Sequence, residues 1–362
     1  MVKRAPRILL CGAGTGGHLY PGLATALELR RRHPEAMLLF AGTGRGQELE
    51  AVQRAGLTHA RIRSAGLKGK TPGALLRGLL TLPLSAWDAW RLLSRTRPDL
   101  VIGLGGYSSG APVLLAALRR TPTMVLEQNA APGVTNRLLA RVVSAAAVSH
   151  DGALPHFPGS GFVSGNPVRE AFLAPAPPRP TAGGGHLLVL GGSQGAHALN
   201  VTLMDAAPRL AAARPPIGVT HQTGARDAAA VRRRYAEAGL TARVEPFFEE
   251  MAELMRDADV ILARAGATTL AEIAAVGRPA VRVPLPGAAD DHQRWNAEAL
   301  VAAGAAELLP QAALTGELVA ARVLRLIADD ARRLEMSAAA RRLARPDAAA
   351  AIADRAEQLM GS

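Results

Sequence analysis

Cysteine is almost absent from this chain of 362 residues, because Cys11 is its only one. A disulfide framework within the chain and a cysteine-rich zinc site are therefore excluded, and a reducing compartment is indicated. Aromatic residues make up only 3% of the chain, which leaves few rings for stacking against nucleic-acid bases. No apolar run reaches the roughly 18 residues that cross a bilayer, and the run 8–11 is too short for a signal peptide.

Acidic residues are scarce in the first half of the chain. Residues 1–165 contain 20 Lys and Arg against 8 Asp and Glu, whereas residues 166–362 contain 22 of each kind. The whole net charge of +12 therefore lies in the first half, and a one-sided positive field attracts phosphates or anionic lipid headgroups. An arginine-rich composition is the plain alternative, but a composition bias alone should not respect a domain boundary.

Apolar residues make up 49% of the chain, enough to bury a large core. Short apolar runs alternate with helix-length segments, as buried parallel strands do in α/β proteins. The runs lie at residues 7–11, 37–41, 100–104, 124–126, 145–149, 187–190, 218–222, 244–247, 260–263 and 280–283. Because the alternation occurs twice, the sequence predicts two Rossmann-like domains. The prolines and glycines of 165–180 mark their seam, and a helix broken at Pro346 ends the chain.

Two glycine-rich loops follow predicted strands, one in each half. Residues 12–18 and 191–196 let the backbone approach a phosphate at the N-terminus of the next helix. The second predicted strand has no acidic residue at its tip to bind a ribose, so a nicotinamide dehydrogenase is disfavoured. The loop at 191–196 lacks the Gly-Lys-Ser/Thr ending of a P-loop ATPase. Tight packing is the alternative interpretation of either loop alone.

The most specific stretch is residues 264–272, Arg-Ala-Gly-Ala-Thr-Thr-Leu-Ala-Glu. A predicted strand ends in a glycine turn, Thr268 opens a helix, and Glu272 follows in about its first turn. A carboxylate there can accept two hydrogen bonds from a ribose diol while the N-terminal amides of the helix face a diphosphate. A cap at Thr268 with a dipole-complementing acid at Glu272 is the plain alternative, but it does not explain Gln293 and Asn296 one element later.

Seven motifs in order carry a resemblance that covers nearly the whole chain. They are GTGGH (14–18), GGYSSG (105–110), EQN (127–129), GNPVR (165–169), GGSQGA (191–196), GATTLAE (266–272) and DHQRWNA (291–297). Together they resemble the MurG family, peripheral membrane enzymes that add N-acetylglucosamine to the undecaprenyl-diphosphate-linked muramyl-peptide precursor of peptidoglycan. Leu126 and Ala265 depart from the family, which often has histidine and serine there.

The resemblance implies an α/β GT-B fold, with two Rossmann-like doubly wound parallel-sheet domains facing a cleft. Residues 1–167 would form an N-terminal domain for acceptor and membrane, and residues 168–340 a C-terminal domain for UDP-GlcNAc. Residues 341–362 would form a helix packing back on the N-terminal domain. The implied partners are UDP-N-acetylglucosamine and undecaprenyl-diphosphate-MurNAc-pentapeptide (lipid I), which becomes lipid II in peptidoglycan synthesis. A role in cell shape and cell division would follow.

By matching position, the resemblance also assigns the donor site. Its residues are Thr15, Gly16, Gly17, Asn129, Arg169, Ser193, Phe248, Ala267, Thr268, Thr269, Glu272 and Gln293. Ser193 and Arg169 would contact the diphosphate, and Glu272 would contact the ribose. The backbone of Phe248 would bind uracil, and Gln293 would bind sugar hydroxyls. Thr15, Gly16 and Gly17 would lie at the cleft, near the donor sugar and the acceptor diphosphate.

Transfer of the sugar passes through an oxocarbenium-like state in which an acceptor hydroxyl loses its proton. His18 is the candidate general base because it directly follows the glycine loop and because histidine is the side chain best suited to proton transfer near neutral pH. A ligand of the acceptor phosphate is its alternative role, and Glu127 is the second candidate base. The family implies inversion to a β-1,4 linkage with no metal ion or other cofactor. Asp257 and Asp259 are more typical of a helix-to-strand junction than of a metal-binding DxD motif.

Residues 66–97 combine apolar and basic side chains, and Asp88 is their only acid. Two of the three tryptophans lie here, and tryptophan favours the headgroup boundary of a bilayer. The segment predicts an amphipathic surface for anionic lipid, while packing of its Leu and Trp against the sheet is the alternative. The predicted membrane contacts are Leu75, Leu79, Leu82, Trp87, Lys68, Lys70 and Arg77. We expect a peripheral protein at the cytoplasmic face of the plasma (inner) membrane.

Two other classes of protein compete with this interpretation. A lipid galactosyltransferase or a UDP-N-acetylglucosamine 2-epimerase would share the GT-B fold, but the motifs EQN, GNPVR and GTGGH favour the transferase. A basic nucleic-acid-binding protein is disfavoured, because the sequence has no recognised binding module and few aromatic residues.

Overall fold

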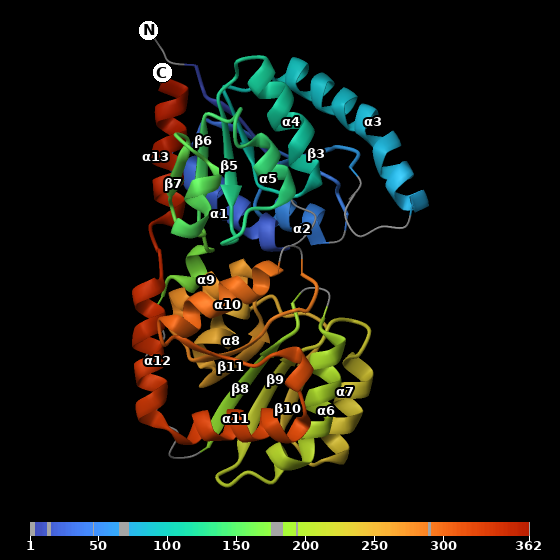
Figure 1. Ribbon diagram of the computed structural model, residues 1–362, viewed down its shortest axis with the longest axis vertical. Coiled ribbons are helices and arrows are strands. Elements are labelled where there is room, and N and C mark those ends of the chain that lie inside the picture. Colours follow the sequence, from blue (N-terminus) through green and yellow to red (C-terminus); the bar gives the residue numbers. More distant parts are fainter. Residues whose placement is uncertain are drawn as a thin grey trace. The chain divides into compact units, whose positions relative to one another are not determined.

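The computed structural model describes residues 4–12, 16–45, 47–64, 72–174, 184–192, 195–288 and 291–361, apart from the side chains of residues 47 and 72–80. The chain divides into two compact units. Unit 1 contains the residues up to Arg169 and those from Arg345 onward, and unit 2 contains Glu170–Ala344. Each unit is an α/β domain built on one parallel sheet (Figure 1). Within the described ranges, no helix is both long and apolar enough to cross a membrane.

Unit 1 has a seven-stranded sheet in the order β3-β2-β1-β4-β5-β6-β7. Its strands are β1 (Arg7–Cys11), β2 (Met37–Gly42), β3 (Thr58–Arg61), β4 (Leu100–Gly103), β5 (Thr123–Glu127), β6 (Ala145–Val148) and β7 (Gly161–Val163). Its helices are α1 (Gly16–Arg32), α2 (Gln47–Arg54), α3 (Pro72–Thr96), α4 (Tyr107–Leu118), α5 (Val134–Leu139), the 3-10 helix η1 (Asp151–His156) and α13 (Ala348–Gly361). The strand order reverses between β1 and β4, and ligands bind beyond the carboxyl ends of strands at such a switch point.

Helices cover both faces of this sheet, because side chains alternate along each strand. On β1, Ile8 and Leu10 join one core cluster with α1, α2 and α13. Leu9 and Cys11 join a second cluster with α3, α4 and α5. Strands buried on both faces need apolar side chains at every position, which explains the continuous apolar runs in the sequence.

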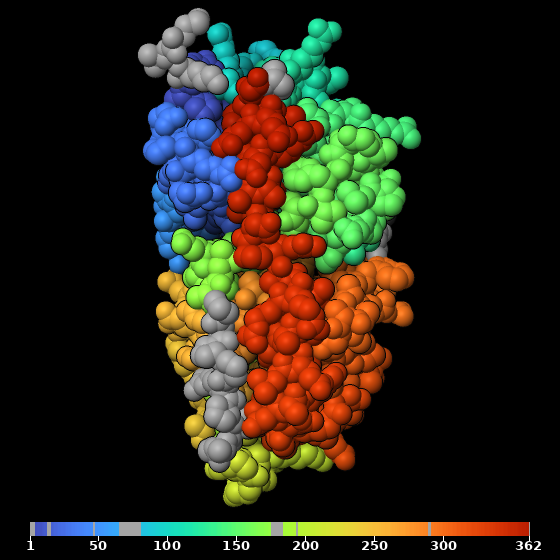
Figure 2. Space-filling view, turned by 90° about the vertical axis from the view of Figure 1, so that its left-hand side faces the viewer, coloured from blue at the N-terminus to red at the C-terminus, as the bar shows by residue number. Residues whose placement is uncertain are grey.

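The C-terminal helix α13 belongs to unit 1 and packs along α1. At the end of α1, Arg32 donates to Asp354 Oδ1 at 2.5 Å and to the carbonyl of Ala350 at 3.2 Å. Gly165 allows the chain segment before α13 to pass close by, because it has φ +81° and a Cβ there would lie 2.4 Å from the Cβ of Arg345. Figure 2 shows α13, in red, between the blue and green segments of unit 1.

Unit 2 has a six-stranded sheet in the order β10-β9-β8-β11-β12-β13. Its strands are β8 (Gly185–Leu190), β9 (Ile217–Gln222), β10 (Ala242–Glu245), β11 (Val260–Arg264), β12 (Ala280–Val283) and β13 (Ala306–Leu308). Its helices are η2 (Glu170–Phe172), α6 (His197–Ala211), α7 (Ala228–Glu237), α8 (Met251–Asp257), α9 (Ala267–Val276), α10 (His292–Ala302), η4 (Gln311–Ala313), α11 (Gly316–Ala328) and α12 (Asp330–Leu343). All its strand pairs are parallel, and the order reverses between β8 and β11.

The main core cluster of unit 2 lies on one face of its sheet. Val281 and Val283 of β12 belong to it, together with side chains of α6, α7, α11 and α12. Because neighbouring residues of a strand face opposite sides, Arg282 between these two valines points to the other face. Arg282 is fully buried there.

Three strands are not predicted by the sequence analysis, namely β3, β7 and β13. They form three of the four sheet edges. Edge strands have one neighbour and carry fewer buried side chains, so they need no continuous apolar run. The last predicted edge strand, at 244–247, is observed two residues earlier, as Ala242–Glu245.

Candidate functional site

Three sequence motifs of unit 1 lie at or after the carboxyl ends of β1, β4 and β5, and the segment after β4 contacts residues of the other two. The imidazole of His18 packs on Gly105, where φ is +97° and a Cβ would lie 2.7 Å from Cδ2 of His18. The side chain of Gln128 donates to the carbonyl of Leu104 at 3.3 Å. The segment 104–105 therefore contacts both His18 and Gln128, and sequence reasoning did not foresee the role of Gln128.

His18 is the third residue of α1 and is half-buried. Gly16 begins the helix, and Gly17 is exposed. Glycines at the first two positions leave the N-terminal N–H groups of the helix uncovered by side chains, and these groups with the helix dipole favour an anion. The placement of His18 suits both a proton acceptor and a phosphate ligand.

The carboxylate of Glu127 is 2% exposed and organises the loop after β5. Its Oε1 accepts hydrogen bonds from the N–H of Asn129 at 3.0 Å and from Nδ2 of Asn129 at 3.2 Å. Its Oε2 accepts from the N–H of Gly133 at 3.0 Å and from Nδ2 of Asn136 at 2.9 Å. Four donors satisfy both oxygens, so the carboxylate orients Asn129 and is engaged within its own loop.

Arg169 ends the motif at 165–169, and its guanidinium lies over the ring of Tyr20, with Cζ 4.4 Å from the ring centroid. Tyr20 lies two residues after His18 on α1. Such a cation–π contact orients the guanidinium plane. Arg169 therefore belongs to the same unit as His18 and lies beside the first turns of α1.

In unit 2, Gln222 at the end of β9 links two predicted donor loops. The N–H of Phe248 donates to Oε1 of Gln222 at 3.1 Å, and Nε2 of Gln222 donates to the carbonyl of Gly192 at 3.2 Å. The N–H of Phe248 is thus satisfied within the protein, so a uracil contact with this backbone would use its carbonyl. Sequence reasoning missed Gln222, although a polar residue that ends an apolar strand is a signal for it.

Helix α9 begins at Ala267, and its N-cap residue is Gly266, with no side-chain cap. The interpretation of Thr268 as a cap is therefore wrong. Thr268 and Glu272 lie four residues apart, which places them on one face of the helix, and each is 6% exposed. Thr269 and Ala267 are half-buried. Glu272 is the sixth helical residue and so lies in the second turn.

Gln293 is the second residue of α10, and its Oε1 accepts a hydrogen bond from the N–H of Leu285 at 3.0 Å. This bond fixes the orientation of the amide, so the Nε2 group is the part that can donate to a sugar hydroxyl. Asn296, from the same motif, is fully buried.

Asp257 and Asp259, the two aspartates before β11, lie where they end a helix and link two strands. Asp257 ends α8, and Oδ2 of Asp259 accepts from the N–H of His186 at 2.7 Å, which joins β11 to β8. Across the part of the chain that the structure describes, no group of three or more His, Cys, Asp or Glu residues is arranged to hold a metal ion.

Helix α3 presents two tryptophans to solvent. Trp87 is 56% exposed and Trp90 is 47% exposed, and their rings stack with centroids 5.2 Å apart. Arg119 lies over Trp90, with Cζ 5.7 Å from the ring centroid. The opposite face of α3 is buried, with Ala89 and Leu93 in the core. The alternative interpretation required the tryptophans to pack against the sheet. They do not pack against it.

Several predicted site residues fall outside this description. Thr15, Ser193, Lys68 and Lys70 lie outside the described residues, and so do the side chains of Leu75, Leu79 and Arg77. Leu82 is described and is 48% exposed.

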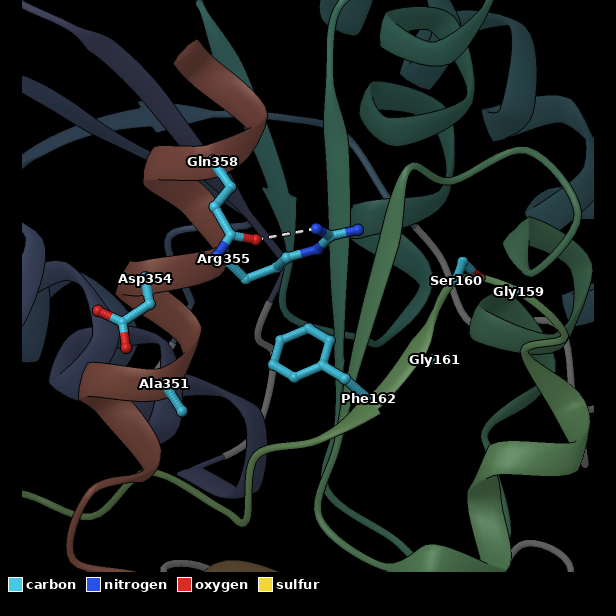
Figure 3. A pocket seen from close by; sticks show the side chains of 8 residues that line it. All are labelled: Gly159, Ser160, Gly161, Phe162, Ala351, Asp354, Arg355 and Gln358. Carbon is cyan, nitrogen blue, oxygen red and sulfur yellow. Dashed lines mark hydrogen bonds between the residues drawn. The ribbon is translucent and has the colours of Figure 1, made fainter. Parts of the chain in front are cut away.

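A pocket of unit 1 lies between β7 and α13 (Figure 3). It is lined by Gly159, Ser160, Gly161, Phe162, Ala351, Asp354, Arg355 and Gln358. Arg355 donates to Gln358 Oε1 at 2.9 Å on its helical side. None of the predicted site residues lines this pocket, so it is not the candidate site.

Two domain families match the chain. The glycosyltransferase family 28 N-terminal domain matches residues 8–148, and the glycosyltransferase family 28 C-terminal domain matches residues 186–352. Together with the two Rossmann-like domains, these matches define a glycosyltransferase of the GT-B type.

Relatives narrow this class. The UDP-N-acetylglucosamine–N-acetylmuramyl-(pentapeptide) pyrophosphoryl-undecaprenol N-acetylglucosamine transferase of Anaeromyxobacter dehalogenans (strain 2CP-C) is 46% identical over 350 residues, 96% of this chain and 91% of the relative. The crystal structure of Acinetobacter baumannii MurG has a TM-score of 0.75 and 31% identity, covering 98% of this chain and 99% of that one. The chain belongs to this family of N-acetylglucosamine transferases, the MurG family.

A more distant structure shares the fold alone. The UDP-GlcNAc 2-epimerase from Neisseria meningitidis, solved with bound UDP-GlcNAc, has a TM-score of 0.67 but only 13% identity, covering 98% of this chain and 99% of that one.

Proposed function

We propose that this protein transfers N-acetylglucosamine from UDP-N-acetylglucosamine to the muramyl sugar of undecaprenyl-diphosphate-linked MurNAc-pentapeptide. The product would be lipid II, the precursor of peptidoglycan. The observation that carries the proposal is the 46% identity to a transferase with this name over 96% of the chain.

Unit 2 would bind the donor. Glu272 is a buried carboxylate two turns into α9, which suits the acceptance of two hydrogen bonds from a ribose diol. The uncapped N-terminus of α9 and the loop before α6 supply N–H groups for a diphosphate. Gln222 holds the backbone of Phe248 beside Gly192, so a uracil and a phosphate would be bound at linked loops. Gln293 would donate to the sugar, and Ser193 would contact the diphosphate.

Unit 1 would supply the base and bind the acceptor. His18 would accept the proton of the muramyl hydroxyl as the new bond forms and the bond to UDP breaks, which inverts the anomeric carbon to give a β-1,4 linkage. Negative charge grows on the departing diphosphate, and helix N-termini and Arg169 would stabilise it. Asn129, held by Glu127, would contact the sugar.

The surface of α3 would bind the membrane that carries the acceptor. Its exposed apolar side chains lie beside arginines, and Asp88 and Asp99 are the only acids between residues 72 and 120. The acid Asp88 is paired with Arg63, through Oδ2 and Nε at 2.7 Å. Exposed tryptophans beside an excess of positive charge suit an anionic lipid surface. The acceptor precursor and this surface together would place the protein at the cytoplasmic face of the plasma membrane.

The test is a product assay with two controls. The purified protein is incubated with UDP-N-acetylglucosamine and a short-chain lipid-diphosphate-MurNAc-pentapeptide, and the lipid is analysed by mass spectrometry. We expect one added N-acetylhexosamine, released UDP, and no product from UDP-galactose. Conversion of the donor to its 2-epimer, with no change in the lipid, would instead identify an epimerase and overturn the proposal.

A further inference from the structure

Arg282 lies in the interior of unit 2, and no acid among the described residues is paired with it. The residue is 0% exposed, in the middle of β12. Within the described ranges its Nε and Nη1 have no hydrogen-bond partner, and no carboxylate oxygen lies within 4.0 Å of its nitrogens. Burial of an ion without a counter-charge is costly. A single hydrogen bond to a backbone carbonyl leaves this charge uncompensated, and an anion is the group that would compensate it.

The guanidinium of Arg282 reaches the carboxyl edge of the sheet. Its Nη2 donates to the carbonyl of Arg264, the last residue of β11. The side chain of Arg264 on β11 bonds in the opposite direction, to the end of β12. Its Nη1 donates to the carbonyls of Val283 at 3.3 Å and Pro284 at 3.4 Å. Nη2 of Arg264 donates to Oε1 of Gln311 at 2.7 Å. Two guanidinium groups thus hold the ends of β11 and β12 to each other.

Both arginines are desolvated, and in the part of the chain that the structure describes neither is paired with an acid. Burial lowers the pKa of Arg264, and burial lowers the pKa of Arg282 to about 9. Arg282 therefore remains charged near neutral pH. Positive charge in a water-poor region exerts a strong field on a nearby anion, since little solvent screens it.

The two strand ends lead into the loops that the proposed function assigns to the donor. The carbonyl of Arg264 is two residues before Gly266, the N-cap residue of α9. Pro284 is followed by Leu285, whose N–H holds Oε1 of Gln293. The paired arginines therefore set the position of α9 relative to Gln293.

We propose that Arg282 is a positioning residue for the diphosphate of a nucleoside diphosphate sugar, holding the turn between β11 and α9 and supplying positive charge that the ligand neutralises. The inference rests on the proposed function, because that function places the donor at this turn. The cost of burying Arg282 in the free protein is then offset when the diphosphate binds.

The test compares Arg282→Met with Arg278→Met. Arg278 is the matched control because it is 4% exposed, donates through Nη2 to the carbonyl of Arg256, and lies just before the amino end of β12, away from the carboxyl edge. Calorimetry measures the dissociation constants of UDP and of uridine, which lacks the diphosphate, and thermal unfolding gives Tm. For R282M we expect UDP affinity about tenfold weaker, as loss of a charge-assisted contact gives, with uridine affinity within about twofold of wild type. The thermal unfolding measurement verifies that R282M is folded when its affinities are compared with those of wild type.

Other outcomes separate this inference from the proposed function. An unchanged UDP-to-uridine preference in R282M, or an equal loss in R278M, would overturn the role of Arg282 while the donor site stands. Wild-type protein that binds neither probe would overturn the proposed function itself. If R282M does not fold, Arg282→Lys decides, since it keeps the charge. The preference is the logarithm of the ratio between the dissociation constants of uridine and UDP. R282K should retain more than half of the wild-type value, and complete loss of the preference would contradict the electrostatic role.

Discussion

His18 and Glu127 are both able to accept a proton, but their surroundings differ. Four donors, three in the loop after β5 and one on α5, satisfy the carboxylate of Glu127, which is 2% exposed. His18 is half-buried at the start of α1, where its ring packs on the backbone of Gly105. A general base must reach the substrate proton, so we propose His18 for the chemical step, while the hydrogen bonds of Glu127 organise the loop geometry.

The variant His18→Ala tests that assignment. We expect turnover to fall roughly 10²–10⁴-fold, as loss of a general base does, with the dissociation constant of UDP unchanged because His18 belongs to unit 1. Turnover and calorimetric UDP affinity are measured on the same preparation. His33→Ala is the control, because His33 is a half-buried histidine that directly follows the C-terminal end of α1. Near-normal turnover in H18A would remove His18 from the role of base.

The ribose contact of Glu272 is tested with a ligand that lacks one hydroxyl. Wild-type protein should bind UDP more tightly than 2′-deoxy-UDP, because a carboxylate accepts from both ribose hydroxyls. In Glu272→Ala the UDP affinity should fall about tenfold and the preference between the two ligands should disappear. Glu335→Ala, at a side chain 68% exposed on α12, should keep both properties. A preference that survives in E272A would contradict the ribose assignment.

The site residues differ in how far the sequence could predict them. His18, Glu127 and Glu272 stand inside short motifs, so a local pattern was enough to select them. Gln222 and Arg282 act through partners 26 and 18 residues away, at Phe248 and Arg264. Their function depends on which strand ends lie side by side, which a linear pattern does not show. The alternative interpretation of Thr268 as the N-cap of α9 is wrong for a related reason, since Gly266 is the N-cap residue and has no side chain to reveal it in the sequence.

At the level of elements, the interior strands were predictable and three edge strands were not. Burial on both faces makes β1, β4, β8 and β11 continuous apolar runs, and their number and spacing already indicate a parallel sheet. Strand β3 reads Thr-His-Ala-Arg and β13 reads Ala-Glu-Leu, because an edge strand has one neighbour and a partly solvated face. Such strands form because they pair with a neighbouring strand of the sheet, and their own sequence does not predict them.

The loop after β5 tests whether Glu127 is structural. In Glu127→Gln one oxygen becomes an amino group that faces N–H donors, so the free energy of unfolding in urea should fall by about 1–3 kcal/mol. Glu50→Gln, at a side chain 72% exposed, should leave it unchanged. Loss of turnover in E127Q with no change in unfolding free energy would make Glu127 the base after all.

The contact between α1 and α13 should depend on pH. The hydrogen bond from Arg31, and then that from Arg32, lowers the pKa of Glu28 to about 2, and Arg32 also bonds Asp354 on α13. A carboxyl with a lowered pKa in the folded state contributes stability above its unfolded pKa near 4.5, and that contribution is lost as pH falls toward 2.

Arg32→Ala should therefore lower Tm at pH 7 and flatten the decline of Tm between about pH 4.5 and pH 2. Amide hydrogen exchange in α13 should also become faster, because Arg32 no longer bonds Asp354 and the carbonyl of Ala350. Arg45→Ala, on an exposed arginine of the same unit, is the control. Wild-type exchange rates in α13 of R32A would show that the apolar contacts alone hold this helix.

For the whole molecule, the charge asymmetry of the sequence corresponds to two units with different proposed tasks. The positive excess lies in residues 1–165, and the exposed tryptophans of α3 lie in the same unit. Vesicle binding should rise with the fraction of anionic lipid and fall with salt, because exposed charges are screened. The double change Trp87→Ser and Trp90→Ser should reduce the bound fraction at least about threefold, through loss of interfacial burial.

The third tryptophan supplies a matched control for that experiment. Trp295 is 55% exposed on α10 of unit 2, so Trp295→Ser should leave vesicle binding unchanged. Equal binding by all variants, indifferent to lipid charge and salt, would contradict a membrane role for α3.

The most direct measurement is a crystal structure of the protein soaked with UDP. The ribose hydroxyls should lie within hydrogen-bond distance of the Glu272 carboxylate, with the diphosphate against the loop that contains Ser193 and the first turn of α9. Density for the nucleotide at any other place on the molecule would contradict the claim that unit 2 binds the sugar donor.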